Sequence, residues 1–291
     1  MKILVTGSSG FIGATLVEYL KNAGYDVNGI DIASKENTEK VDIRDYDKLI
    51  EVFKKINPNV VIHLAAIASV PISEEEPREC FETNISGTLN VAKVANMYGA
   101  KLIFTSSAAV YGKTQILPTP ITTPIVPTNI YGLSKEMGEN IVRYFCQNAV
   151  VFRLFNVYGP NCNRSYVIPD TIRKLLNNKD KIEMQGTGEE RRDFIYINDV
   201  IQAIRVAIEN DVCGTFNLGT GKTVSIKEVV NNIKILMDKE SVPVYFKGTT
   251  RIGDFNINWA DMEGKNKISG WDSKVELTEG LTNTIKSMVH E

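Results

Sequence analysis

Short apolar runs alternate with longer amphipathic segments through the first half of the chain. The apolar runs are rich in β-branched residues and cover residues 2–7, 27–31, 60–66, 101–107 and 149–156. The segments between them predict helices over residues 14–24, 44–56, 86–100 and about 134–148. Runs that are apolar throughout indicate strands buried on both faces, and their alternation with helices is typical of a parallel sheet. The expected fold class is therefore α/β, with a doubly wound parallel sheet.

The second half of the chain has a different pattern. Four prolines between residues 117 and 128 are incompatible with a regular helix or a central strand and predict a surface loop. Beyond it, short helical patterns at 168–178 and 197–209 lie among glycine-rich turns and scattered apolar runs. We expect one domain over residues 1–157, to which the chain returns around 193–224, and a smaller C-terminal α/β domain over residues 158–291.

The composition is that of a soluble globular protein, with 43% hydrophobic and 23% charged residues in a chain of 291. The formal net charge is −2, and the sequence has no dense Lys/Arg cluster, which argues against nucleic acid or an anionic membrane as a partner. No apolar run approaches the roughly 20 residues that span a bilayer, and the first residues do not follow a signal-peptide pattern. We therefore expect a cytoplasmic protein whose partners are small molecules or copies of itself.

The sequence offers little material for a metal site. Its four cysteines, which we expect to be reduced, lie far apart without metal-ligand or redox spacing, and its two histidines are His63 and His290. Neither a metal cofactor nor a histidine-based catalytic triad is expected. His63 lies in an apolar run and is expected to be a hydrogen-bonded core residue rather than a catalyst.

Three regularly spaced glycines follow the first predicted strand, in the stretch TGSSGFIG at residues 6–13. A strand, a glycine turn and then a helix is the context of a dinucleotide-binding turn. There Gly7 permits the tight exit from the strand, Gly10 lets the backbone approach a pyrophosphate, and Gly13 lets the helix pack closely. This arrangement predicts a Rossmann-type cofactor site.

Asp31 closes the second predicted strand, 18 residues beyond Gly13. At that position a carboxylate accepts hydrogen bonds from the adenosine ribose hydroxyls and repels a 2′-phosphate. The sequence therefore favours NAD over NADP.

Tyr131 and Lys135 are four residues apart near the start of a predicted helix, so both project from one helix face. A nearby ammonium stabilises a phenolate, which allows such a pair to act as an acid and base near neutral pH. The stretch TSSAAVYG ends a predicted strand upstream and places Ser107 at the same sheet edge as the glycine turn. Ser107 can donate a hydrogen bond to a substrate oxygen there.

In their order and spacing, these motifs resemble the extended short-chain dehydrogenase/reductase family. Within it the chain is most similar to the NAD-dependent nucleotide-sugar epimerases and dehydratases, typified by UDP-glucose 4-epimerase. The resemblance runs essentially from end to end and rests on TGSSGFIG (6–13), Asp31, HLAA (63–66), NISGTLNV (84–91), SSAAVYG (106–112), YGLSK (131–135), FNVYGP (155–160), RRDFIYINDV (191–200), FNLGTG (216–221) and RIGDFNINWAD (251–261).

The resemblance implies roles for individual residues. It implies a catalytic set of Ser107, Tyr131 and Lys135, with Tyr131 and Lys135 also touching the cofactor. The implied cofactor residues are Gly7, Gly10, Phe11, Ile12, Gly13, Asp31, Asp42, Ile43, Leu64, Ala65, Ala66 and Asn84. The implied substrate residues, besides Ser107, are Asn156, Arg192, Arg251 and Asp254, which would hold the nucleotide of the sugar donor. Arginine suits this role because its guanidinium matches a phosphate with two hydrogen bonds. FNLGTG is as compatible with an ordinary turn as with a ligand contact.

Two alanines narrow the reaction. Related dehydratases carry an acidic pair where this chain has Ala108 and Ala109, and related decarboxylases carry a glutamate at the position of Ala109. Alanine cannot act as a general acid or base. We therefore expect a 4-epimerase that interconverts UDP-glucose and UDP-galactose, or a close UDP-hexose pair, through a transient 4-keto sugar. The alternative is a 4-reductase or 4-dehydrogenase of the deoxysugar type, since the segment ASKENTEK (33–40) is as short as in dTDP-4-dehydrorhamnose reductases.

Quaternary structure is inferred from the family resemblance. The predicted helices around residues 88–98 and 136–147 carry apolar side chains on more than one face. Two such helices from each of two chains would form a four-helix contact in a homodimer, although burial within one chain explains the pattern nearly as well.

Overall fold

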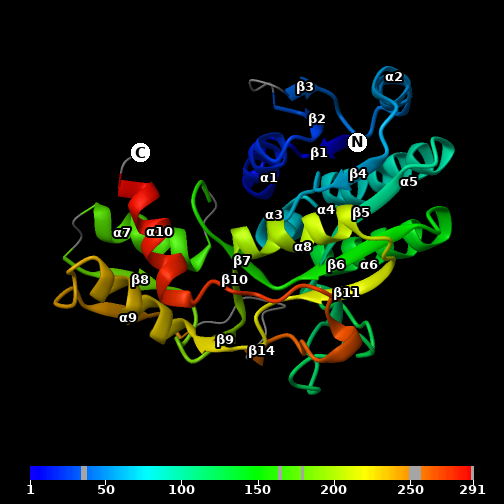
Figure 1. Cartoon of the computed structure of the whole chain (residues 1–291). Helices are drawn as coiled ribbons and strands as arrows, with labels where there is room; N and C mark the ends of the chain where they lie inside the picture. Colours follow the sequence, from blue (N-terminus) through cyan, green and yellow to red (C-terminus); the bar gives the residue numbers. More distant parts are fainter. Residues whose placement is uncertain (34–37, 163–165, 178–179, 249–256, 290–291) are drawn as a thin grey trace. The chain divides into compact units, whose positions relative to one another are not determined.

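The computed structural model describes residues 1–33, 38–162, 166–177, 180–248 and 257–289 (Figure 1). The chain folds into two compact units. Unit 1 comprises Met1–Lys113, Thr122–Leu154 and Ala203–Phe216. Unit 2 comprises Thr114–Ile121, Phe155–Gln202 and Asn217–Glu291. The chain thus enters unit 2 and returns to unit 1 twice before it ends in unit 2.

Unit 1 is built on a seven-stranded sheet with the order β11-β6-β5-β4-β1-β2-β3. The strands are β1 (Lys2–Thr6), β2 (Asp26–Asp31), β3 (Thr38–Lys40), β4 (Val60–His63), β5 (Lys101–Ser107), β6 (Ala149–Leu154) and β11 (Gly214–Leu218). All neighbours from β3 to β6 pair in parallel. The strand order reverses between β1 and β4, the place where doubly wound sheets bind ligands. The predicted fold class, a Rossmann-type α/β sheet, is confirmed.

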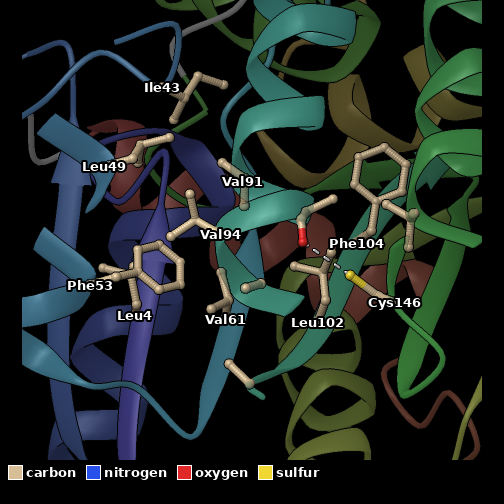
Figure 2. Close-up of a cluster of buried hydrophobic side chains, with 14 of the residues drawn as sticks. Leu4, Ile43, Leu49, Phe53, Val61, Val91, Val94, Leu102, Phe104 and Cys146 are labelled. Atoms are coloured by element: carbon tan, nitrogen blue, oxygen red, sulfur yellow. Dashed lines mark hydrogen bonds between the residues drawn. The ribbon is translucent and has the colours of Figure 1, made fainter. Parts of the chain in front are cut away.

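Helices cover both faces of this sheet. They are α1 (Phe11–Asn22), α2 (Tyr46–Ile56), α3 (Val70–Glu75), α4 (Pro77–Phe81), the π-helical turn η1 (Glu82–Gly87), α5 (Thr88–Met97), the 3-10 turn η2 (Ala108–Tyr111), α6 (Ile130–Phe145) and the second half of α8 (Ile197–Glu209). On one face, α2, α5 and α6 cover side chains of β1, β4 and β5 such as Leu4, Val61 and Leu102, which have no exposed surface (Figure 2). On α6's side of this cluster the Cys146 Sγ donates to the Ala92 carbonyl at 3.4 Å (Figure 2). Each fully buried side chain of this size contributes about 1.5–3 kcal/mol, so this layer holds the sheet rigid beneath the site.

One predicted helix boundary was wrong in a way that matters for the site. Helix α6 begins at Ile130 and ends at Phe145, whereas the pattern predicted about 134–148. The Asn129 side chain caps the helix by accepting from the Gly132 N–H at 2.7 Å. Tyr131 therefore lies within the first turn of α6.

Unit 2 is a smaller α/β unit made of short strands. Its strands pair as β7 (Asn156–Tyr158) with β10 (Phe194–Tyr196), as the group β12 (Val224–Ser225), β9 (Arg191–Arg192) and β14 (Ile257–Asn258), and as β8 (Ile182–Met184) with β13 (Val244–Phe246). Its helices are α7 (Val167–Leu176), the first half of α8, α9 (Ile226–Leu236), the short turn η3 (Gly264–Asn266) and α10 (Leu277–Val289). The predicted strand 149–156 is split: β6 ends at Leu154, and the chain from Asn156 pairs with β10 as β7.

Within the described ranges, none of the helices combines the length and the apolar character needed to cross a lipid bilayer.

Candidate active site

The glycine turn leaves no room for side chains. Gly7 has a φ of +71°, and a Cβ placed on it would lie 2.6 Å from the Ala65 backbone nitrogen at the end of β4. A Cβ on Gly13 would collide with the Gly7 carbonyl, which itself accepts from the Gly10 N–H at 3.1 Å. The turn from Gly7 to Gly13, which we call the glycine cradle, is therefore packed backbone against backbone with the end of β4.

The cradle leads into the N-terminus of α1. This helix begins at Phe11, its N-cap is Gly10, which provides no side-chain cap, and its first turn contains no acidic residue. The N–H groups of a first helical turn attract anions, and here nothing on the N-cap residue occupies them. Phe11 and Ile12 are half-buried, and Gly13 is buried against the turn. The arrangement fits the pyrophosphate of a dinucleotide.

Asp31 lies beside this turn at the end of β2. Its carboxylate accepts from the Ser9 N–H at 3.0 Å through one oxygen and from the Ala33 N–H at 3.0 Å through the other. Each carboxylate oxygen has a further lone pair, so the group can still accept from two ribose hydroxyls. Its fixed position next to the glycine turn suits an adenosine ribose.

The other predicted cofactor residues lie around the same end of the sheet. Asp42 forms an ion pair with Arg44 at 2.7 Å, and the hydrogen bonds from that guanidinium hold the pKa of the Asp42 carboxyl below its ordinary value. The Ile43 side chain is 4% exposed and packs in the cluster of Figure 2. Residues 64–66 are half-buried where β4 ends. Asp42 and residues 64–66 thus offer surface at this end, whereas the Ile43 side chain belongs to the core.

Asn84 lies in the π-helical turn η1 and connects three segments. Its side-chain oxygen accepts from the Ile67 N–H at 2.8 Å, and its amide nitrogen donates to the Ile67 carbonyl at 3.0 Å and to the Ser134 Oγ at 2.9 Å. Ser134 in turn donates to the Tyr131 carbonyl at 2.8 Å. Asn84 therefore ties the loop after β4 to the first turn of α6, where Tyr131 lies. Sequence reasoning missed Ser134, although its place three residues after Tyr131 was a signal.

Lys135 is brought to the end of β5. Its ammonium is buried, donates to the Thr105 carbonyl at 2.8 Å and lies 5.0 Å from the centre of the Phe104 ring. Ser107 follows two residues after Thr105 and accepts from the Ala109 N–H at 3.1 Å. That bond does not use the Ser107 hydroxyl hydrogen, which can be donated to a substrate oxygen. Helix α6 packs on β5, so the helix face that carries Lys135 and half-buried Tyr131 meets the strand that ends in Ser107.

His63 is a core residue, as predicted. Its Nδ1 lies 2.7 Å from Thr6 Oγ1 and its Nε2 lies 2.9 Å from Thr88 Oγ1, and the residue is 1% exposed. Burial, and then the positive charge of Lys135, lower the pKa of His63 to about 3. The imidazole is thus neutral at physiological pH.

The predicted nucleotide-binding residues Asn156 and Arg192 belong to unit 2. Asn156 starts β7 and donates to the Asp193 carbonyl through both its backbone N–H and its side-chain amide, each at 3.0 Å. Arg192 is half-buried in β9, where its guanidinium donates to the Arg191 carbonyl at 3.0 Å. Arg251 and Asp254 lie outside the described residues. Asn156 is therefore bonded to Asp193, the residue that follows Arg192 in the chain and that the sequence analysis did not select as a site residue.

The chain matches known proteins over almost all of its length. The model of the NAD dependent epimerase/dehydratase family matches residues 3–219. A UDP-glucose 4-epimerase of Mycolicibacterium smegmatis is 30% identical over 313 residues, which cover 98% of each chain.

Solved structures agree with this match. A UDP-glucose 4-epimerase of Thermotoga maritima with UDP-glucose has a TM-score of 0.92 and 33% identity, covering 100% of this chain and 99% of that one. A UDP-N-acetylglucosamine 4-epimerase of Methanobrevibacter ruminantium, in complex with UDP-N-acetylmuramic acid, has a TM-score of 0.90 and 30% identity, covering 99% and 98%.

The glycine cradle, the position of Asp31 beside it and the Tyr131–Lys135 helix face agree with these matches: the chain belongs to the NAD-dependent epimerase/dehydratase family, and its cofactor is NAD.

Proposed function

We propose that this enzyme is an NAD-dependent 4-epimerase that interconverts UDP-glucose and UDP-galactose through a transient 4-keto sugar. The observation that carries the proposal is the end of β5, where Ser107 and the buried ammonium of Lys135 lie next to Ala108 and Ala109. The two alanines are buried in η2, so this turn supplies no carboxylate for elimination or decarboxylation. The similarity to the UDP-glucose 4-epimerase of Thermotoga maritima supports the same reaction.

In the proposed mechanism the chain's own residues move one proton and orient the sugar. Tyr131 removes the proton from the sugar 4-hydroxyl, and the Lys135 ammonium on the same helix face stabilises the phenolate. Ser107 donates its hydroxyl hydrogen to the oxygen at C4 and orients it. NAD, when bound in the glycine cradle, supplies reversible two-electron chemistry at C4 and is regenerated in each cycle. The 4-keto sugar turns in the site so that its other face is reduced, and Tyr131 then returns the proton to the C4 oxygen, which leaves the sugar inverted at C4.

We assign the two units different roles within this proposal. Unit 1 binds NAD through the glycine turn and Asp31 and carries Tyr131. Unit 2 binds the nucleotide diphosphate through Asn156, Arg192, Arg251 and Asp254, since guanidinium groups match phosphate oxygens in pairs. The cytoplasmic location expected from the sequence stays a prediction.

A proton NMR time course tests the reaction. UDP-galactose is supplied with purified enzyme and NAD at about one hundredth of the sugar concentration, so that only a recycled cofactor can convert more than a trace. Anomeric signals of UDP-glucose that grow to an equilibrium mixture are expected. Tyr131→Phe should abolish turnover and retain NAD binding, because only the phenolic oxygen is lost.

Two other outcomes would change the assignment. Conversion that stops at the amount of NAD would favour the alternative, a 4-reductase or 4-dehydrogenase, which the short segment ASKENTEK (33–40) suggested. Turnover of UDP-N-acetylglucosamine alone would keep the reaction and replace the sugar, in line with the Methanobrevibacter ruminantium structure.

We also propose a homodimer that forms through α5 and α6, which pack on each other in unit 1. Large apolar side chains on these helices are exposed: Leu89, Met97, Leu133, Met137 and Tyr144, of which Tyr144 is 83% exposed. The spacing 133, 137 and 144 places three of them along one face of α6. Light scattering after size exclusion should show a dimer that Met137→Glu dissociates, whereas Ile235→Glu on α9, which is also exposed and apolar, should leave it intact. A monomeric wild type would refute the dimer.

A further inference from the structure

Asp193 is a buried carboxylate with four hydrogen-bond donors around it. One carboxylate oxygen accepts from the Thr220 N–H at 2.8 Å and the Thr220 hydroxyl at 2.7 Å. The other accepts from the Gly221 N–H at 3.0 Å and the Ala260 N–H at 3.1 Å. The residue has no exposed surface. All these partners belong to unit 2 and come from two segments distant from Asp193 in sequence.

The motif FNLGTG at 216–221 is built around this carboxylate. A Cβ on Gly219 would lie 2.6 Å from the second carboxylate oxygen of Asp193 and 2.8 Å from the Ala260 Cβ. Gly221 has a φ of +72°, which turns its N–H toward the carboxylate at low conformational cost. The glycines therefore make room for Asp193, which explains the motif without a direct ligand contact.

The backbone of Asp193 joins the predicted nucleotide-binding residues. Its N–H donates to the Asn258 carbonyl at 3.0 Å, and its carbonyl accepts both donors of Asn156. Arg192 precedes it in β9, the middle strand between β12 and β14. The Asp193 backbone thus ties Asn156 and Asn258 to β9, the strand in which Arg192 directly precedes it.

The buried charge needs all of these donors. Burial raises the pKa of the Asp193 carboxyl, and the hydrogen bonds from Thr220, Ala260 and Gly221 act in the opposite direction by stabilising the carboxylate. An amide side chain has only one acceptor oxygen, so asparagine would satisfy one pair of donors and turn its NH₂ group toward the other pair. The position is therefore matched to a carboxylate.

We infer that Asp193 is the positioning residue of the nucleotide-binding half of the site: the four hydrogen bonds to its carboxylate fix its backbone, and that backbone sets Asn156 and Arg192 for a nucleoside diphosphate. The inference rests on the proposed function only for the class of ligand. Asp193 does not itself touch the ligand; it acts through Asn156 and Arg192.

The test compares Asp193→Asn with a matched control in the same unit. Asp199 is also a buried aspartate, 4% exposed, and its carboxylate accepts the N–H groups of Lys274 and Val275 at 3.1 Å. Asp199→Asn should therefore lower thermal stability without changing nucleotide affinity. Thr220→Val removes one donor and keeps the backbone N–H, which provides a milder variant if Asp193→Asn does not fold.

UDP affinity and NAD affinity are measured separately by isothermal titration on each variant. For Asp193→Asn we expect the UDP Kd and the sugar-nucleotide KM to rise about tenfold or more, while the NAD Kd and kcat stay within about threefold. Thr220→Val should change the UDP Kd in the same direction by a smaller factor. Equal UDP affinity in wild type and Asp193→Asn, or an equal loss in Asp199→Asn, would overturn the inference and leave the proposed function standing. A wild type that binds no UDP would overturn the nucleotide class itself, and the inference with it.

Discussion

The buried imidazole of His63 makes the stability of unit 1 sensitive to pH. In the folded protein the pKa of His63 is about 3, against an ordinary value of 6.5. Hydroxyl groups hold both ring nitrogens of the neutral imidazole, Nδ1 by Thr6 Oγ1 at 2.7 Å and Nε2 by Thr88 Oγ1 at 2.9 Å. A second proton would have to be added in this buried site, beside the Lys135 charge.

The direction in which pH changes the free energy of unfolding follows from proton binding. Below pH 6.5 the unfolded chain binds a proton at His63 and the folded chain does not, so the free energy of unfolding falls as the pH falls from about 6.5 toward 3. Each pH unit below 6.5 lowers the free energy of unfolding by about 1.4 kcal/mol as long as the folded imidazole stays neutral. This residue alone therefore contributes a loss of about 2 kcal/mol between pH 7 and pH 5. Carboxylates with ordinary pKa values near 4 contribute little over that interval.

The perturbation is His63→Gln, which keeps a hydrogen-bonding side chain that does not titrate. Wild type and variant are unfolded in urea at pH 7 and pH 5, and amide exchange is followed on peptides that cover β1 and β4, so that unit 1 is observed by itself. Because wild type and variant are compared with each other at the same pH, the intrinsic pH dependence of amide exchange cancels. The wild type should lose about 2 kcal/mol more than the variant on acidification. Parallel losses in the two proteins would refute the assignment of His63 as a neutral core residue.

Three further predictions follow from the same unit. Gly13→Ala should raise the NAD Kd about tenfold or more, since the added methyl meets the Gly7 carbonyl; an unchanged Kd in a titration would contradict the steric role of the turn. Asp31→Ser should reduce the preference for NAD over NADP about tenfold, measured as the ratio of the two Kd values, because the carboxylate that repels a 2′-phosphate is gone; a constant ratio would exclude this role. The Arg153 guanidinium, 3% exposed, forms an ion pair with the buried Glu139 carboxylate at 2.8 Å. Glu139→Ala removes this carboxylate and should lower the free energy of urea unfolding by about 3–5 kcal/mol. The double variant Glu139→Leu, Arg153→Met should recover most of this loss. A loss in the double variant as large as in Glu139→Ala would show that the unpaired charge is not the cause.

Local patterns determined much of this protein from its sequence alone. Apolar runs that fit a strand buried on both faces placed β1, β2, β4, β5 and β6, because residue spacing and side-chain shape act within a few residues. The glycine turn was readable for the same reason, since the left-handed φ at Gly7 and the close packing at Gly13 are requirements on single positions. The family, and with it NAD, followed from the order of such motifs.

The tertiary structure decided which distant segments meet. The start of α6 depended on one cap at Asn129, and the ammonium of Lys135 was fixed by a carbonyl 30 residues away on β5. The sequence did not single out Asp193, because its donors Thr220 and Ala260 lie 27 and 67 residues further along the chain. Such contacts depend on strand register and on which loops the packed core brings together, and no local pattern encodes them. The sequence by itself determined the elements and the chemistry they carry, whereas only the folded chain determined which side chains hold that chemistry in place.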